Sequence, residues 1–186
     1  ILAGSLLDPW GEGAFFYTEE NGVRNNFKER WMRVFPEYAD IFTFDMLDGS
    51  ADKLKEPNMV LLPLSLSNKL FGNQSAVGKQ LHMVNSKGVF TIGGVYRDFP
   101  DNSSVGNSIY YQLNPKENFQ NFGNWNYMFY VRLDDPANAS GLFENFKAHF
   151  DVSTLSKDFS WEGGGVSLVL NPLTEVHFCL LYTSPS

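Results

Sequence analysis

The alternation of hydrophobic and polar residues predicts a β-rich chain, and its clearest strand signal lies at 89–99. This segment is rich in β-branched and aromatic residues, which suit a pleated and half-buried surface. Gly93 and Gly94 interrupt it without side chains to pack, which predicts a bulge or a close backbone approach. Pro100 lacks a backbone N–H and opens a turn-forming segment, so the strand is expected to end near Phe99.

Further hydrophobic runs bounded by turn residues place the remaining elements. Strands are predicted at 14–19, 27–35, 43–47, 59–63, 78–84, 108–113, 126–133 and 166–170. The Asn21–Gly22 pair predicts a hairpin between the first two, and a turn at 85–88 returns 78–84 onto the strand from Val89. Helical segments are predicted at 36–42, 50–54, 64–71 and 139–150, with Ser50 as an N-cap and Gly72 as a C-terminal stop. Residues 1–13 and 114–126 are predicted to be irregular.

Composition limits the function classes. The chain has 186 residues, of which 43% are hydrophobic, so it can build a substantial core. Its net charge is −7, and Lys and Arg are not clustered, which argues against a nucleic-acid partner. Cys179 is the single cysteine and cannot form an internal disulfide.

The segment from Gly72 to Gln80 superficially resembles a phosphate-binding loop. Five residues separate Gly72 from Gly78, whereas the phosphate-binding motif has four between its glycines. Gln80 follows Lys79 where the motif requires a hydroxyl side chain, and a predicted strand follows instead of a helix. A helix end with a turn is therefore expected here, and no nucleotide or other cofactor is expected.

Other candidate chemistry is weak at the level of spacing. His82, His149 and His177 lack metal-ligand spacing, and no G-x-S-x-G motif is present. Asp98 with Asp101 could form an acid–base pair, but the surrounding residues favour a turn. Three aspartates resemble a calcium loop without its closing glutamate, and four tryptophans could line a sugar- or peptide-binding face or pack in the core: Asp45, Asp48, Asp52; Trp10, Trp31, Trp125, Trp161. No catalytic site is predicted.

Four segments in order, 35–49, 70–81, 94–103 and 172–177, carry a family resemblance. Together they resemble the MacB-like periplasmic core domain of FtsX-type ABC transporter permeases, especially those of Bacteroides-like bacteria. The residues that mark the motifs are structural, not catalytic: Gly72, Gly78, Gly93, Gly94, Asp98, Pro100 and Asn102.

Short strands outnumber helices and hairpins outnumber crossovers, which predicts an α+β fold with two lobes. The resemblance implies how the chain divides between them. Residues 1–48 and 124–178 would form a porter-like α/β lobe, incomplete at its N-terminus, with a β-rich lobe inserted at 49–123. The two crossings carry Asp48–Gly49 and Gly123–Asn124, where few backbone contacts would allow a hinge. Residues 179–186 depart from the family and are expected to be a non-native tail.

The resemblance also implies a function. The chain would be a non-catalytic domain on the periplasmic side of the bacterial inner membrane, attached through flanking transmembrane helices. It would couple the action of an ABC ATPase subunit, reached through those helices, to export or release of an unidentified substrate, beside a second permease copy. The alternatives left open are a free-standing glycan- or peptide-binding module that uses surface aromatics, and a hydrolase with a site assembled by the fold.

Overall fold

The computed structural model describes residues 1–8, 13–84, 86–114, 127–149 and 169–174. The described residues up to 132 form one compact unit, and those from 133 onward form a second. No helix in the described part is long and apolar enough to cross a bilayer.

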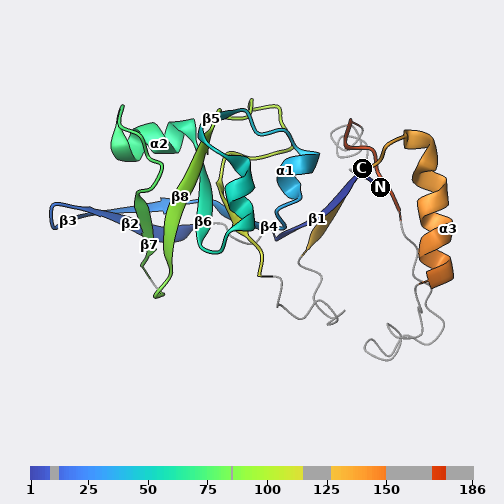
Figure 1. Ribbon diagram of the computed structural model, residues 1–186, viewed down its shortest axis with the longest axis horizontal. Coiled ribbons are helices and arrows are strands. Elements are labelled where there is room, and N and C mark those ends of the chain that lie inside the picture. Colours follow the sequence, from blue (N-terminus) through green and yellow to red (C-terminus); the bar gives the residue numbers. More distant parts are fainter. Residues whose placement is uncertain (9–12, 85, 115–126, 150–168, 175–186) are drawn as a thin grey trace, which may run out of the picture. The chain divides into compact units, whose positions relative to one another are not determined.

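The first unit is built on one mixed β-sheet (Figure 1). Along the main path the strand order is β10-β1-β4-β9-β6-β8-β7-β2-β3, and β5 adds to β8 beside this path. The strands of the described residues are β1 (Ala3–Asp8), β2 (Ala14–Glu20), β3 (Val23–Glu29), β4 (Trp31–Val34), β5 (Met46–Gly49), β6 (Met59–Pro63), β7 (Gln80–Met83), β8 (Val89–Tyr96), β9 (Ile109–Gln112) and β10 (Met128–Arg132).

Strand β8 is the central element, as its sequence predicted. It pairs in parallel with β6 along one edge, and on the other edge first with β7 and then with β5, both antiparallel. The regular strand ends at Tyr96, three residues before the predicted end at Phe99. Beyond the strand, the backbone bonds to a side chain and not to a neighbouring strand: the Phe99 N–H donates to the Asn107 side chain at 2.8 Å.

The predicted bulge in β8 is confirmed. Val60 of β6 is opposite Ile92, but the next residue, Leu61, is opposite Gly94, so Gly93 is the extra residue on the β8 side. A bulge of this kind bends the strand and increases its local twist. The bend lets one strand serve two successive partners, β7 and β5, on the same edge.

The prediction that residues 1–13 are irregular is wrong for 3–8. β1 pairs antiparallel with β10 from Ala3 to Leu7 and with β4 at Leu7 and Asp8. Ser5 and Leu7 are buried on one face, an alternation that the glycine at position 4 obscured in the sequence. Gly4 has a packing role, because the Phe129 ring lies 3.5 Å from where its Cβ would be.

The hairpin at Asn21–Gly22 is confirmed, but its second strand runs from Val23 to Glu29 and not over the predicted 27–35. Both turn residues have positive φ, 53° and 77°, as a type I′ turn requires. The predicted strand 27–35 divides at Arg30. β3 pairs with β2, whereas β4 continues between β1 and β9 and pairs in parallel with β9.

The sheet carries a hydrophobic core on each face, and β6 shows the alternation. Leu61 belongs to one core, while Val60 and Leu62 belong to the other. The first core contains the tyrosine- and phenylalanine-rich cluster near α1 (Tyr38–Ile41) and η1 (Ala51–Lys55). The second packs under α2 (Leu64–Phe71) and includes residues of β2, β7 and β9. Burial on both faces explains why β6 reads as a continuous apolar run.

The two-lobe division is not confirmed. Strands from the expected porter-like lobe and from the expected insertion are hydrogen-bonded neighbours in the same sheet, both at β4–β9 and at β2–β7. Each core also draws residues from both sides of the expected boundary at 48/49. The described residues of the first unit up to 114 are therefore joined through a shared sheet and shared cores.

All four predicted helical segments contain a helix, but two have other bounds: 36–42 is helical only at Tyr38–Ile41, and 50–54 is a 3-10 helix at Ala51–Lys55. Ser50 caps η1, its side chain accepting from the Asp52 N–H at 3.2 Å, and Gly72 ends α2 with φ 60°. In the second unit, η2 (Pro136–Asn138) is capped by Asp135 and leads into α3 (Ala139–His149). Of the strand predicted at 166–170, residues 169 and 170 are not in a strand, and the rest lie outside the described residues.

Candidate functional site

Three of the glycines singled out from the sequence meet where β5 pairs with β8, a place called here the glycine junction: Gly49, Gly93 and Gly94. Gly49 has φ 69° and lies opposite Gly94 in the strand register. A Cβ at Gly49 would lie 2.1 Å from the Gly93 carbonyl oxygen. A Cβ at Gly93 would lie 2.5 Å from the Lys53 Cβ. A Cβ at Gly49 would collide with backbone, and one at Gly93 with the first carbon of the Lys53 side chain, so these two positions require glycine.

Polar contacts fasten the glycine junction to the loop after α2. The Ser75 hydroxyl donates to the Asp48 carboxylate at 2.6 Å and accepts from the Val77 N–H at 3.3 Å. The Ser50 N–H donates to the Gly93 carbonyl at 3.3 Å. Three segments that are far apart in the chain are thereby held at one place.

Gly72 and Gly78 frame the loop that leads from α2 to β7. Both adopt positive φ, 60° and 85°, and the Gly78 N–H donates to the Ile92 carbonyl of β8 at 2.8 Å. The Lys79 ammonium donates to the Gln74 side chain at 2.8 Å and lies 4.5 Å from the centre of the Phe71 ring. Lys79 thus contacts residues at and just after the end of α2. The loop ends the helix and makes a turn, as predicted.

Asp98 stabilises α2 from a distance of 33 residues. Its carboxylate accepts from the Ser65 N–H at 3.1 Å, in the first turn of a helix whose own N-cap residue, Pro63, offers no side-chain hydrogen bond. A carboxylate at a helix N-terminus accepts a hydrogen bond from a free backbone N–H and interacts favourably with the positive end of the helix dipole. Asp98 is therefore a capping residue, not half of an acid–base pair.

Pro100 and Asn102 lie in the expected turn after β8. The Pro100 carbonyl accepts from the Ser103 N–H at 2.8 Å, and Asn102 is exposed. Sequence reasoning missed the residue that fixes this loop. The Asn107 side chain accepts from the Phe99 N–H at 2.8 Å and donates to the Phe99 carbonyl at 3.0 Å. Only the general preference of asparagine for such backbone contacts pointed to it.

Of the two predicted hinge crossings, only Asp48–Gly49 lies among the described residues. Gly123 and Asn124 lie outside the described residues, so that crossing stays a prediction. At Asp48–Gly49, the sparse backbone contacts on which the hinge was based are not found, because both residues are paired within β5 and packed against β8. Movement at this crossing would break sheet hydrogen bonds as well as the Asp48–Ser75 contact.

Beside the junction, one core holds a cluster of buried tyrosines. Tyr38, Tyr96 and Tyr110 are each at most 2% exposed. The Tyr96 hydroxyl donates to the Ser108 carbonyl at 2.8 Å and accepts from the Ser108 N–H at 3.0 Å. Burial raises the pKa of all three phenols well above the ordinary value, so they act as neutral hydrogen-bonding groups.

Other candidate chemistry from the sequence is dispersed. In the described part of the chain no three His, Cys, Asp or Glu side chains gather closely enough to hold a metal ion. Asp45, Asp48 and Asp52 each contact a different partner: Arg97, Ser75 and Lys55. His82 stacks on Tyr17, and His149 contacts its own helix. His177 and Cys179 lie outside the described residues.

Trp31, the one tryptophan among the described residues, packs against the core and does not line a binding face. Trp31 stacks on Tyr111 with ring centres 4.2 Å apart and contacts Phe16 and Phe90 edge-on, so it packs against the second core. Trp10, Trp125 and Trp161 lie outside the described residues.

A hollow of about 280 Å³ lies between the end of α2 and strands β2, β3 and β7. Its polar groups include Glu19 and Lys79, which already have partners in Arg24 and Gln74. The full lining is Thr18, Glu19, Glu20, Asn25, Leu70, Phe71, Lys79, Gln80 and His82.

Residues 9–148 match the MacB-like periplasmic core domain. The chain belongs to this family. It is thus a periplasmic domain of the kind found in ABC transporter permeases, as its sequence motifs indicated. A search among curated proteins found no match.

Solved structures agree with the family. A domain of a putative permease protein from Porphyromonas gingivalis is 27% identical, with a TM-score of 0.67, and the match covers 83% of this chain and 67% of that one. The periplasmic region of MacB from Actinobacillus actinomycetemcomitans shares the fold at 15% identity and a TM-score of 0.53, covering 86% and 77%. The extracellular domain of the noncanonic ABC-type transporter YknZ from Gram-positive bacteria gives 16% and 0.50, covering 84% and 76%.

Proposed function

We propose that this MacB-like domain is a non-catalytic coupling element of an inner-membrane permease. On the periplasmic side it would carry movement of the transmembrane helices, driven by an ABC ATPase, to the export or release of a substrate. Two permease copies would face each other there. A domain that transmits movement from one end to the other must be rigid, because internal bending would reduce the movement that reaches its far end.

The observation that supports this role is the glycine junction. The junction joins β5, β8 and the loop after α2 by close backbone packing and by the Asp48–Ser75 hydrogen bond. Opening it would cost several hydrogen bonds at about 1 kcal/mol each and expose core surface. A full switch between two states needs roughly 5.5 kcal/mol of differential binding, so little could be lost to internal bending. Residues 1–114 of the first unit are therefore expected to move as one body.

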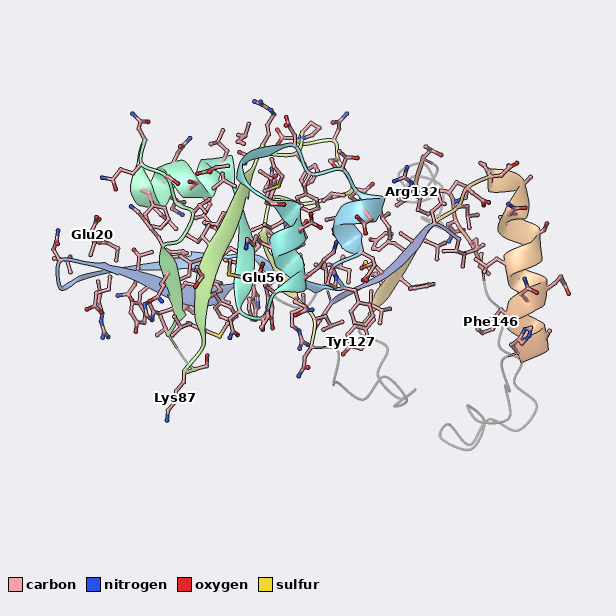
Figure 2. All side chains as sticks on the ribbon, in the orientation of Figure 1. Glu20, Glu56, Lys87, Tyr127, Arg132 and Phe146 are labelled. Carbon is pink, nitrogen blue, oxygen red and sulfur yellow. The ribbon has the colours of Figure 1, made fainter. Side chains whose placement is uncertain are left out.

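Distance measurements in the working transporter test this proposal without knowledge of the substrate. Spin labels would replace Glu20 in β2 and Glu56 after η1, which are both exposed and labelled in Figure 2. They lie on opposite sides of the predicted lobe boundary. In the complete permease with its ATPase in lipid vesicles, the distance between the two labels of one copy should stay constant when ATP is added.

The matched measurement uses the Glu56 label alone, which reports the distance between the two copies. That distance should change on ATP binding. If the distance within one copy changes instead, the lobes move against each other and the hinge at Asp48–Gly49 is real. If neither distance responds to ATP, the domain is a passive docking surface and the coupling role is rejected.

A further inference from the structure

Strand β3 forms one end of the sheet and offers an unpaired edge. It is seven residues long and is hydrogen-bonded to β2 along its whole length, and no second strand neighbours it within the described residues. Figure 1 shows the β2–β3 hairpin extending from the body of the sheet. The backbone groups on the open side of such a strand can pair with another chain.

The outer face of this edge carries an arginine that is held in place. The Arg24 guanidinium lies 4.6 Å from the centre of the Tyr17 ring, and the same ring stacks on His82 at 4.7 Å. Its Nε donates to the Glu19 carboxylate at 3.0 Å. The hydrogen bond to Glu19 uses only Nε. The two terminal amino groups of the guanidinium therefore remain available, and together they can bind a carboxylate in a bidentate manner.

A second cation continues the row. Lys28 lies opposite Phe15, with its ammonium 5.7 Å from the ring centre. Arg24, Asn26 and Lys28 alternate along β3 and share the outer face, since the intervening Phe27 stacks on Phe16 of the core. Alternate side chains on a strand repeat at about 7 Å. The edge therefore presents a regular row of hydrogen-bond donors in a protein of net charge −7.

The inner face of the same strand carries two incompletely covered apolar side chains, Val23 and Phe27, with the exposed Asn25 between them and Glu29 at its end. Val23 is 60% exposed, and Phe27 is only partly buried against the second core. A strand added beside β3 would cover both side chains with its own inward-facing residues.

We propose that β3 accepts an added strand from a partner protein, an extended segment with acidic side chains at alternate positions and apolar side chains between them. Main-chain hydrogen bonds would supply affinity, and the matching repeat would set the register, with carboxylates beside Arg24 and Lys28. The inference is independent of the coupling role, because binding is measured on this chain alone.

A fluorescent seven-residue peptide alternating glutamate and valine is the probe, and fluorescence anisotropy is the measurement. Saturable binding is expected, and it should weaken as ionic strength rises because the cations are exposed. A peptide of the same composition with its glutamates and valines in separate blocks should bind much more weakly. Two further peptides carry N-methyl groups on alternate amides, so that only one of them loses the bonds facing β3. That one should fail to bind, and the other should bind.

Variants of the chain complete the test. The double substitution Arg24→Gln with Lys28→Gln should weaken binding about fivefold, the combined effect of two cross-strand charge pairs. Lys55→Gln removes the same kind of charge from η1, where Lys55 pairs with Asp52, and should leave binding unchanged.

Three results would overturn the proposal. No saturable binding up to about 1 mM would mean that the charges on β3 only protect the edge from association. Equal binding of the block peptide would show general charge attraction. Equal binding of both N-methylated peptides would show that no strand is added.

Discussion

At the scale of single residues, the close approach at Gly49 decides what the chain tolerates. Gly49 and Gly22 both have positive φ, 69° and 77°, so alanine at either site meets the same backbone strain. They differ in space. A Cβ at Gly49 would lie 2.1 Å from a carbonyl oxygen of β8, whereas no atom lies within 4 Å of one at Gly22.

Gly49→Ala is therefore expected to destabilise the fold by about 2–4 kcal/mol, the sum of backbone strain and overpacking. Gly22→Ala should cost only about 1 kcal/mol, from the strain alone. Urea denaturation of both variants measures the difference. Equal losses in the two variants would mean that β5 can move away from β8 at little cost.

At the scale of elements, α2 depends on a carboxylate outside its own segment. Asp98→Ala leaves the Ser65 N–H without its partner, and we expect a loss of about 1 kcal/mol in the free energy of unfolding. Asp101→Ala, three residues later in an exposed turn, is the matched control and should be neutral. Thermal melts that show the two variants to be alike would remove Asp98 from the cap.

The same scale shows what the sequence can predict. Strand β8, its bulge and the Asn21–Gly22 hairpin were predicted because each depends on local chemistry: β-branched residues, a glycine pair and a turn dipeptide. β1 was missed because its pairing partner, β10, lies at the far end of the first unit, and pairing partners leave no local signal. The break at Arg30 was missed for the same reason, since only the neighbours of β4 require it.

In the candidate site, too, some residues could be predicted from local sequence and their distant partners could not. Gly72, Gly78, Gly93 and Asp98 could be singled out by type, because turns, bulges and caps restrict residue identity. Their partners could not be predicted. Ser75 beside Asp48, and Ser65 beside Asp98, are contacts between segments separated by 27 and 33 residues, which spacing alone cannot reveal.

At the scale of the whole molecule, the buried tyrosines set an alkaline limit on stability. Burial raises the pKa of Tyr38, Tyr96 and Tyr110 in the folded state, so they hold their protons there after unfolded tyrosines, with a pKa of about 10, have lost theirs. The unfolded state then binds fewer protons, and stability falls as pH rises above about 10.

The expected result is that ionisation of these tyrosines coincides with unfolding. Ultraviolet absorbance reports tyrosinate, and circular dichroism reports the sheet, as pH is raised. Ionisation of every tyrosine while the circular dichroism stays native would contradict the buried cluster.

The pairing of β1 with β10 delays the completion of the sheet during synthesis. Ala3 lies opposite Arg132, so β1 leaves the ribosome well before the strand that pairs with it. At about 5–20 residues per second, that interval is on the order of ten seconds. During it, β1 lacks the neighbour on one side, and the apolar Leu6 and Leu7 remain available to other nascent chains. The pairing of β1 with β10 is therefore a late step in the folding of the first unit.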